Sequence, residues 1–262
     1  MRDDVKSRKA AMWGSAPWEL VAATMGQIHI RLVAALDPRR GQRWLDVGTG
    51  SGAVALRAAR AGAEVTGVDL APALIETARR LAADEGLAVA FDVGDAEHLP
   101  YPDASFDVVA SAHGVVFAAD HAAAGRELAR VCRRGGRVGL TAWRPGEHGD
   151  AFARVLAPFE PPAPPGPRPG DWGRPEHAAE MLEEAFELDF VPEMWTQVGE
   201  SGEAIWELLT TSSPPFKDLA ESLDADRRAE LHAAWVEYFE GHRREGEVRA
   251  PHEYMLILGT RR

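Results

Sequence analysis

Three glycines at alternate positions, Gly48, Gly50 and Gly52, have the spacing of a ligand-binding turn. They follow a short apolar run at 44–47, typical of a buried parallel strand, and precede a helix-forming stretch at 54–59. Strand, glycine turn and helix begin a doubly wound α/β unit, in which ligands bind at the carboxyl ends of strands. Glycine permits positive φ and lets a ligand lie on the backbone, while a helix start favours an anionic group.

A carboxylate at the end of the next strand narrows the ligand class. The stretch 64–69 reads as a strand that ends in Asp69, about 20 positions after Gly48, where an acid can accept hydrogen bonds from ribose hydroxyls. NAD and S-adenosylmethionine both fit this feature. The turn has the pattern D-x-G-x-G-x-G, however, rather than the G-x-G-x-x-G of a pyrophosphate binder. A nucleoside ligand without pyrophosphate therefore suits the turn better.

Taken together, these motifs resemble those of a known family. Residues 45–55 and 65–69 are similar to the first two motifs of class I S-adenosylmethionine-dependent methyltransferases. The resemblance continues through 93–109 and 128–143, which look like the third to fifth strands of the small-molecule branch that includes ubiquinone and menaquinone biosynthesis. It implies a Rossmann-like, doubly wound α/β sheet of seven mostly parallel strands, with the last strand antiparallel. It also implies S-adenosylmethionine as the cofactor.

The same resemblance implies roles for individual residues. Asp46 would bind the methionine amino group directly or through water, which suits a charge that would be costly if buried and unpaired. Asp69 would bind the ribose. Asp95 would accept from the adenine amino group, while the backbone N–H of Ala96 meets the ring. The other residues expected at the cofactor are Trp13, Gly48, Thr49, Gly50, Gly52, Leu70, Glu97, Ser111 and Gly114.

His113 is the candidate catalytic residue, because it follows the fourth strand at the point where cofactor and acceptor would meet. The sulfonium already activates the methyl group, so alignment supplies much of the catalysis. A general base is needed only if the acceptor must lose a proton, and a neutral imidazole suits that task. We expect His113 to lie beside the transferring methyl group, as a base or as part of the wall. No histidine and carboxylate cluster has a persuasive metal spacing.

Composition restricts the partners and the compartment. The chain of 262 residues has a net charge of −12, which disfavours nucleic acid or anionic membrane as the main partner. Cys132 is the single cysteine, so an intrachain disulfide is excluded. Residues 1–14 lack a signal-peptide core, and no later segment approaches membrane-spanning length. We expect a cytoplasmic protein, not inserted in a membrane, that acts on a small molecule. Its oligomeric state cannot be read from the sequence.

The remaining elements follow from periodicity and turn residues. Expected helices are 18–36, 72–83, 120–132, 175–186, 201–212 and 224–244, and further strands are 87–93, 106–112, 137–143, 187–198 and 254–259. The expected division is an N-terminal helical cover (1–41), a cofactor-binding core (42–143), a Pro/Gly-rich loop insertion (144–175), continued sheet core (176–200), a helical lid (201–245) and the final strand (246–262). The aromatic helix face with Trp235 and Phe239 fits a lid over the substrate or an ordinary core equally well.

The expected function is in-line transfer of a methyl group from S-adenosylmethionine to a small, partly apolar acceptor. One alternative is an NAD-dependent oxidoreductase, which also uses an α/β sheet. Another is a catalytically silent S-adenosylmethionine-binding protein, or one that uses the fold for a different reaction, since fold alone does not decide function.

Overall fold

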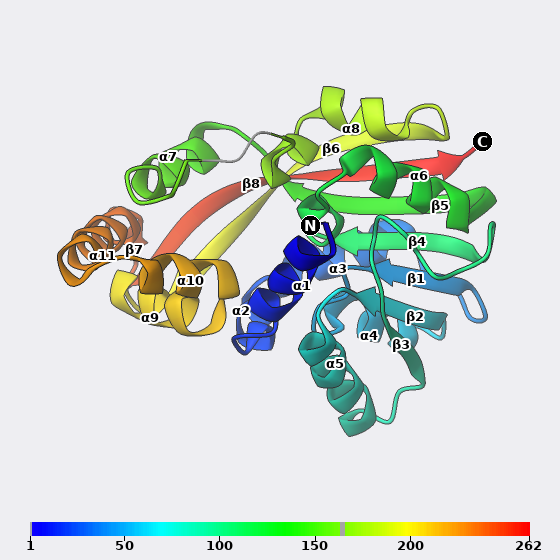
Figure 1. Cartoon of the computed structure of the whole chain (residues 1–262), viewed down its shortest axis with the longest axis horizontal. Helices are drawn as coiled ribbons and strands as arrows, with labels where there is room; N and C mark the ends of the chain where they lie inside the picture. Colours follow the sequence, from blue (N-terminus) through cyan, green and yellow to red (C-terminus); the bar gives the residue numbers. More distant parts are fainter. Residues whose placement is uncertain (1, 163–165) are drawn as a thin grey trace.

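The computed structural model describes residues 2–162 and 166–262. Its centre is one sheet with the strand order β3-β2-β1-β4-β5-β8-β6 (Figure 1). The parallel strands are β1 (Arg43–Val47), β2 (Glu64–Asp69), β3 (Val89–Val93), β4 (Phe106–Ala112) and β5 (Cys132–Trp143). The long strand β8 (Glu247–Arg261) runs antiparallel to both β5 and β6 (Phe186–Gly199). This confirms the Rossmann-like α/β fold with an antiparallel last strand.

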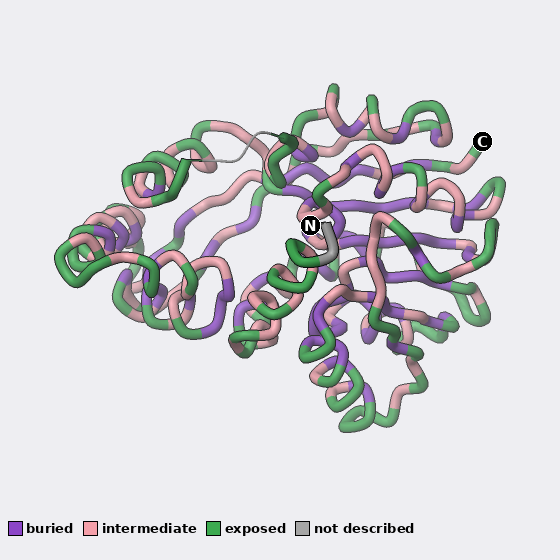
Figure 2. The backbone as a smooth tube through the Cα atoms, viewed as in Figure 1, coloured by how far each residue is buried: buried purple, intermediate pink, exposed green. Residues whose placement is uncertain are grey.

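Helices cover both faces of this sheet, as the alternating pattern predicts. The helices α3 (Gly26–Leu36), α4 (Ala53–Arg60) and α5 (Pro72–Asp84) pack on one face, and α6 (His121–Val131) and α8 (Pro175–Leu182) on the other. Trp44 and Leu45 are neighbours on β1 yet belong to opposite cores, because successive side chains of a strand point to opposite faces. Buried residues therefore follow the central strands in Figure 2.

The N-terminal cover contains more helices than expected. A first helix, α1 (Arg2–Trp13), precedes the apolar segment, and that segment forms α2 (Trp18–Thr24) and α3 rather than one helix. The two meet at Met25 with a bend of 69°. The Thr24 carbonyl, at the end of α2, accepts a hydrogen bond of 3.2 Å from Trp195 Nε1. Among the described residues no single helix is long and apolar enough to cross a membrane, and only this bent pair together meets the length and composition test.

The start of β5 also differs from the expectation. The helix before it ends at Val131, and β5 begins at Cys132 rather than after the two glycines. Gly135 has a φ of +68°, and the pairing of β4 with β5 shifts between Phe106 and Val108. The glycines thus form an irregularity inside the strand instead of the turn before it.

Two strands continue past the rest of the sheet. The pairing of β5 with β8 ends at Trp143, opposite Tyr254, whereas the pairing of β6 with β8 goes on to Gly199. We call the projecting residues, 194–199 and 248–253, the arm. A two-residue strand, β7 (Arg243–Arg244), pairs with β8 near the arm's far end and brings the sheet to eight strands, one more than expected.

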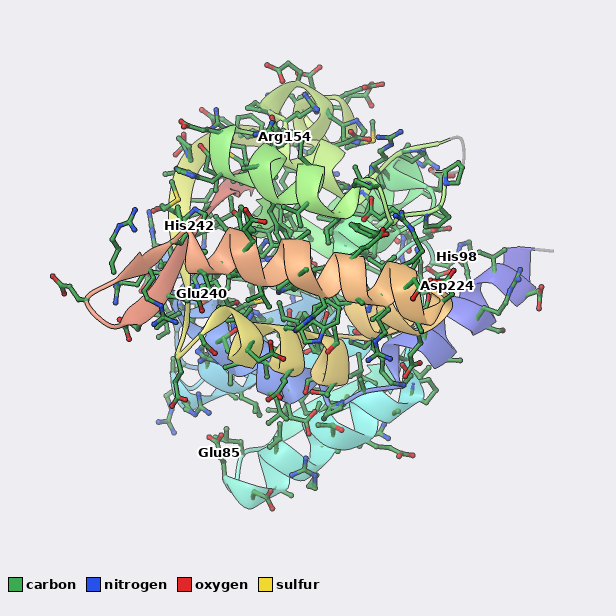
Figure 3. All side chains as sticks on the ribbon, turned by 90° about the vertical axis from the view of Figure 1, so that its left-hand side faces the viewer. Glu85, His98, Arg154, Asp224, Glu240 and His242 are labelled. Atoms are coloured by element: carbon green, nitrogen blue, oxygen red, sulfur yellow. The ribbon has the colours of Figure 1, made fainter. Side chains whose placement is uncertain are left out.

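Four helices surround the arm and form what we call the helical layer (Figures 1 and 3). They are α7 (Glu147–Leu156), α9 (Gly202–Ser212), α10 (Pro214–Ser222) and α11 (Ala225–Glu240). The sequence did not predict α10, and α7 folds inside the segment expected to be a loop. Residues 163–165 of that loop lie outside the described residues. In Figure 3, α11 crosses the view between its cap residue Asp224 and Glu240.

The aromatic face of α11 serves mainly as the core of the helical layer. Leu231, Trp235 and Phe239 are almost fully buried and pack with residues of α9, including Ile205. Phe239 also lines the cavity described below. The interpretation of this face as core is therefore confirmed, and the role of the helices as a lid stays a prediction.

Candidate functional site

A cavity of about 470 Å³ lies at the carboxyl edge of the parallel strands. We call the part lined by the turns after β1, β2 and β3 the turn end, and the part lined by the arm, the end of β5 and the helical layer the arm end. The cavity brings together most of the expected site residues. Those that line it are Trp13, Asp46, Gly48, Thr49, Gly50, Asp69, Leu70, Asp95, Ala96, Glu97, His113 and Gly114, whereas Gly52 and Ser111 do not.

Gly48 holds two turns in contact. Its φ is +66°, and a Cβ there would lie 2.6 Å from Gly114 Cα, so the turn after β1 packs directly on the turn after β4. The sequence suggested that the glycines make room for a ligand; at Gly48 the backbone of Gly114 takes that room. Gly52, with a φ of +87°, starts α4 against Ala78 and Phe91 rather than facing the cavity. Its place among the cofactor contacts is therefore a correction.

Ser111 is the other expected residue that the cavity omits, and its hydroxyl bonds to two backbone groups. Ser111 Oγ donates to the Val47 carbonyl at 2.5 Å and accepts from Val115 N–H at 2.9 Å. It therefore ties the end of β4 to β1 and starts the short 3₁₀ turn η1 (Val115–Phe117). Strand alternation explains the error, since Ala112, one residue later, does line the cavity.

Asp46 is almost completely buried on β1. Its Oδ2 accepts hydrogen bonds from Thr49 Oγ1 at 2.7 Å and from Ala55 N–H at 3.1 Å. Burial raises the pKa of the Asp46 carboxyl to about 7, against the effect of these two bonds. A cationic group bound in the cavity would favour the ionised form, which fits the expected contact with an amino group.

Asp69 connects the glycine turn to the next helix. One carboxylate oxygen accepts from Gly50 N–H and the other from Ala71 N–H, both at 2.9 Å. Burial raises the pKa of Asp69, and the backbone hydrogen bonds oppose this shift. The carboxylate thus stabilises both turns and still lines the cavity, where it keeps acceptor capacity for ribose hydroxyls.

An ion-pair network that the sequence did not predict covers the loop after β3. Lys6 Nζ, from α1, lies 2.5 Å from Asp95 Oδ2 and 2.7 Å from Glu97 Oε2. The other Glu97 oxygen accepts from the N–H groups of Ala119 and Asp120, at 2.7 and 3.1 Å. The N-terminal helix is therefore held over the turn end by two carboxylates that were expected at the cofactor, of which Asp95 was expected at adenine.

His113 lines the cavity just after β4, and its expected position beside the transferring methyl group stays a prediction. Its φ is +54°, an uncommon conformation for a residue other than glycine. Nδ1 lies 2.9 Å from Thr141 Oγ1, and the ring centroid lies 4.3 Å from that of Trp143. Nε2 is buried and has no partner among the described residues. Burial lowers the pKa of His113 to about 3, so the ring is neutral at pH 7.

The arm end is lined mostly by residues that were not singled out in the sequence. They include Trp143, Arg144, Phe152, Trp195, Gln197, Phe216, His252 and Glu253, whereas Phe239 belongs to the aromatic helix face that the sequence did single out. Strand direction carried a usable signal for some of them. Trp143 ends a parallel strand at the same edge as the glycine turn. The last strand is antiparallel, so its first residues, rather than its last, reach that edge.

The residues present fit S-adenosylmethionine at the turn end. Carboxylates are available at three separate points for an amino group, ribose hydroxyls and an adenine amino group, namely Asp46, Asp69 and Asp95. Gly50 has no side chain to fill the space beside Trp18, since a Cβ there would lie 3.4 Å from that ring. Apolar side chains such as Leu74 complete the wall.

Comparison with known proteins gives the same family. Residues 45–140 match the model of a methyltransferase domain. An uncharacterized protein of Mycobacterium tuberculosis is 40% identical over 177 residues, which cover 66% of this chain and 64% of that protein. The demethylmenaquinone methyltransferase of Deinococcus radiodurans is 36% identical over 146 residues, covering 55% of this chain and 56% of that enzyme. The chain thus matches less than two thirds of the length of these curated relatives.

A solved structure extends the likeness to nearly the whole fold. The [4+2]-cyclase SpnF has a TM-score of 0.56 and 26% identity, covering 94% of this chain and 83% of its own. The domain match, the sequence relatives and the sheet topology all indicate a methyltransferase, and they exclude the alternative of an NAD-dependent oxidoreductase. Residues 45–140 thus form a methyltransferase domain, the sheet has the fold of the class I S-adenosylmethionine-dependent methyltransferases, and the cofactor is S-adenosylmethionine.

Proposed function

We propose that the chain transfers the methyl group of S-adenosylmethionine to a small, partly apolar acceptor. The observation that carries this proposal is the continuity of one cavity from the carboxylates of the turn end to the aromatic wall of the arm end. A ligand held at Asp69 and Asp95 would thus share one cavity with a second, apolar ligand. The methyltransferase names among the relatives support the same reaction.

In this proposal the turn end holds the cofactor. Asp46 binds the amino group, Asp69 the ribose hydroxyls and Asp95, with the backbone of Ala96, the adenine. The bound cofactor supplies an activated methyl group for in-line displacement. The chain aligns the acceptor with that methyl group and excludes water, which are contributions worth many powers of ten in rate.

His113 has a positioning role in the proposal rather than that of a general base. An imidazole with a pKa of about 3 has little tendency to take a proton at neutral pH, and Nε2 is covered. The ring supports Trp143, which lines the arm end beside it. The helices α9, α10 and α11, within residues 201–245, act as the lid on the acceptor.

A second candidate is a reaction without methyl transfer, supported by the likeness to a [4+2]-cyclase. Calorimetry with S-adenosylhomocysteine, followed by assay of its formation from S-adenosylmethionine with a panel of hydroxylated and amine-bearing ring compounds, separates the candidates. Formation of S-adenosylhomocysteine that depends on an acceptor supports the transferase. Binding without any turnover across the panel supports a silent binder or a cyclase, and absence of binding rejects both proposals.

A further inference from the structure

Three aromatic side chains of the arm end lie on one face of the sheet. Trp195 pairs directly with His252, and Trp143 pairs with Tyr254, two residues further along β8. Directly paired residues share a face, and so do residues two apart on one strand. The ring centroids of Trp143, Trp195 and His252 accordingly lie 5.4–5.9 Å from one another. We call these three residues the ring face.

The helical layer covers the ring face only in part. Phe152 of α7 meets the His252 ring edge-on, with centroids 5.8 Å apart, and Phe216 of α10 lies 6.1 Å from Phe152. All three side chains line the cavity. Trp143 is nevertheless 36% exposed, so part of its ring is open to a ligand. Aromatic rings in such a wall pack well against another flat ring.

The charged side chains at the arm end offer no free cation to a ligand on the ring face. They are Arg144, Glu160 and Glu253, of which Glu160 is exposed. Glu253 pairs with Met194 on the opposite face of β8, and Arg144 Nη1 lies 3.5 Å from Glu253 Oε1. Within the part of the chain that the structure describes, the arm end therefore has no arginine or lysine without a carboxylate neighbour. An anionic ligand placed here would lose water without gaining a positive partner.

His252 is the polar member of the ring face. Burial lowers the pKa of His252 to about 4, so the imidazole is neutral at pH 7 and has one N–H donor and one acceptor nitrogen. Neither nitrogen has a hydrogen-bond partner among the described residues, and neither is fully covered, in contrast to Nε2 of His113. Since polar groups in an apolar wall are costly when unpaired, a ligand with a hydroxyl or N–H group would be favoured beside this ring.

Gln197 adds a second uncharged polar group on the same face. It lies two residues after Trp195 on β6 and pairs with Ala250, whose small side chain leaves room beside His252. Its Nε2 donates to the Val198 carbonyl at 3.2 Å, and its side chain lines the cavity. The polar groups on this face are thus an amide and a neutral imidazole, neither of which carries a charge to match an ionic ligand.

Resting on the proposed function, we infer that the arm end binds an uncharged acceptor, whose flat ring packs on Trp143 and Trp195 and whose hydroxyl or N–H group forms a hydrogen bond with His252. His252 is then a specificity-determining residue, because it distinguishes this acceptor from a ring of the same shape without the polar group. The two tryptophans set the plane of the acceptor ring, and His252 sets its rotation within that plane.

Three probes with one ring system test the inference on protein saturated with S-adenosylhomocysteine. They are 2-naphthol, 2-fluoronaphthalene, which has a similar shape but no donor, and 2-naphthoate, which is an anion. Calorimetry should show 2-naphthol binding about fivefold more tightly than 2-fluoronaphthalene, the effect of one neutral hydrogen bond. It should bind about tenfold more tightly than 2-naphthoate, because the anion finds no positive partner.

His252→Phe separates the hydrogen bond from the packing, because it keeps an aromatic ring and removes both nitrogens. This variant should lose the preference for 2-naphthol over 2-fluoronaphthalene while its affinity for 2-fluoronaphthalene stays nearly that of the wild type. Trp143→Ala should instead weaken both probes, since it removes the surface on which either ring packs. His98→Phe replaces an exposed histidine that does not line the cavity, and this control should change neither affinity.

The comparison of the three probes on the wild type does not depend on the folding of any variant. Equal affinity for 2-naphthol and 2-fluoronaphthalene, or 2-naphthoate binding as tightly as 2-naphthol, overturns the inference. An unchanged preference in His252→Phe, equal loss of both neutral probes in that variant, or binding of no probe at all does the same. Failure of S-adenosylhomocysteine itself to bind, measured first, overturns the proposed function instead.

Discussion

The turn end of the cavity is shaped mainly by backbone contacts, whereas the arm end is shaped mainly by side chains. At the turn end, Asp46 and Asp69 bond to backbone N–H groups of neighbouring turns, and Gly48 packs backbone on backbone. At the arm end the wall consists of side chains from several elements, and Glu253 keeps an unpartnered oxygen. A shape set by backbone contacts tolerates little change, whereas a wall of side chains can be altered one residue at a time.

Disrupting the contact between Gly48 and Gly114 should cause the largest loss of stability and of cofactor binding among the changes proposed. Gly48→Ala adds a positive-φ cost of about 1–2 kcal/mol and an overpacking cost of about 1–3 kcal/mol. Chemical denaturation should show the combined loss, and calorimetry should show loss of S-adenosylhomocysteine binding. Gly86 is the matched control, with a φ of +65° and nothing within 4 Å of a Cβ. Equal losses of stability in Gly48→Ala and Gly86→Ala would contradict the role of the contact.

Asp69 tests whether the carboxylate binds the nucleoside as well as the turns. Asp69→Asn should weaken S-adenosylhomocysteine binding tenfold or more, because hydrogen bonds to a charged acceptor are worth about 1.5–3 kcal/mol each. Glu64→Gln, at the exposed start of the same strand, should leave the dissociation constant unchanged. If a folded Asp69→Asn variant binds as tightly as the wild type, Asp69 only supports the turns.

Asp46 should make the stability of the cofactor-free protein depend on pH. Its pKa is raised from 3.8 to about 7 on folding, so between these values the folded chain holds more protons than the unfolded chain. The contribution of Asp46 to stability therefore falls as pH rises from about 4 to about 7. Denaturation curves of wild type and Asp46→Asn should differ by this slope. Parallel pH profiles would show that the carboxylate titrates normally.

Lys6 should give the smallest effect, because its ion pairs with Asp95 and Glu97 are partly exposed, and such pairs contribute about 0–1 kcal/mol. In the free protein Lys6 is paired with Asp95, the carboxylate expected to bind adenine, and this pairing competes with the ligand. Lys6→Met should therefore tighten S-adenosylhomocysteine binding up to about fivefold. Arg8→Met, on the same helix but exposed, is the control. Weaker binding in Lys6→Met would mean that Lys6 helps to hold the base.

The sequence alone predicted those features in which the backbone geometry requires a particular type of residue. The glycine turn, the acid that ends β2 and the alternation of strands and helices follow from local rules, and the sheet agrees with them. Ser111 shows the limit of such rules. It stands at the correct edge, yet its hydroxyl bonds to the Val47 carbonyl and the Val115 N–H and does not line the cavity.

The arm end and the N-terminal cover could not be predicted in the same way. Lys6 lies on a polar helix whose place depends on carboxylates about ninety residues away. His252 and Glu253 lie in the segment assigned to the final strand (246–262) but before its apolar stretch at 254–259. The strand β8 begins as early as Glu247 because β6 supplies a long partner. These contacts are tertiary, and no local pattern in the sequence encodes them.

The arm has a consequence for how this protein can diversify. The helices α9 to α11 lie between β6 and β8 in the chain, and Gly199 at the end of β6 pairs with Val248 near the start of β8. The whole insertion is therefore a very long hairpin loop whose ends already meet. Exchanging such a loop leaves the strand register and the turn end untouched. New acceptor pockets can arise by replacing one contiguous stretch of sequence while the site for the cofactor stays the same.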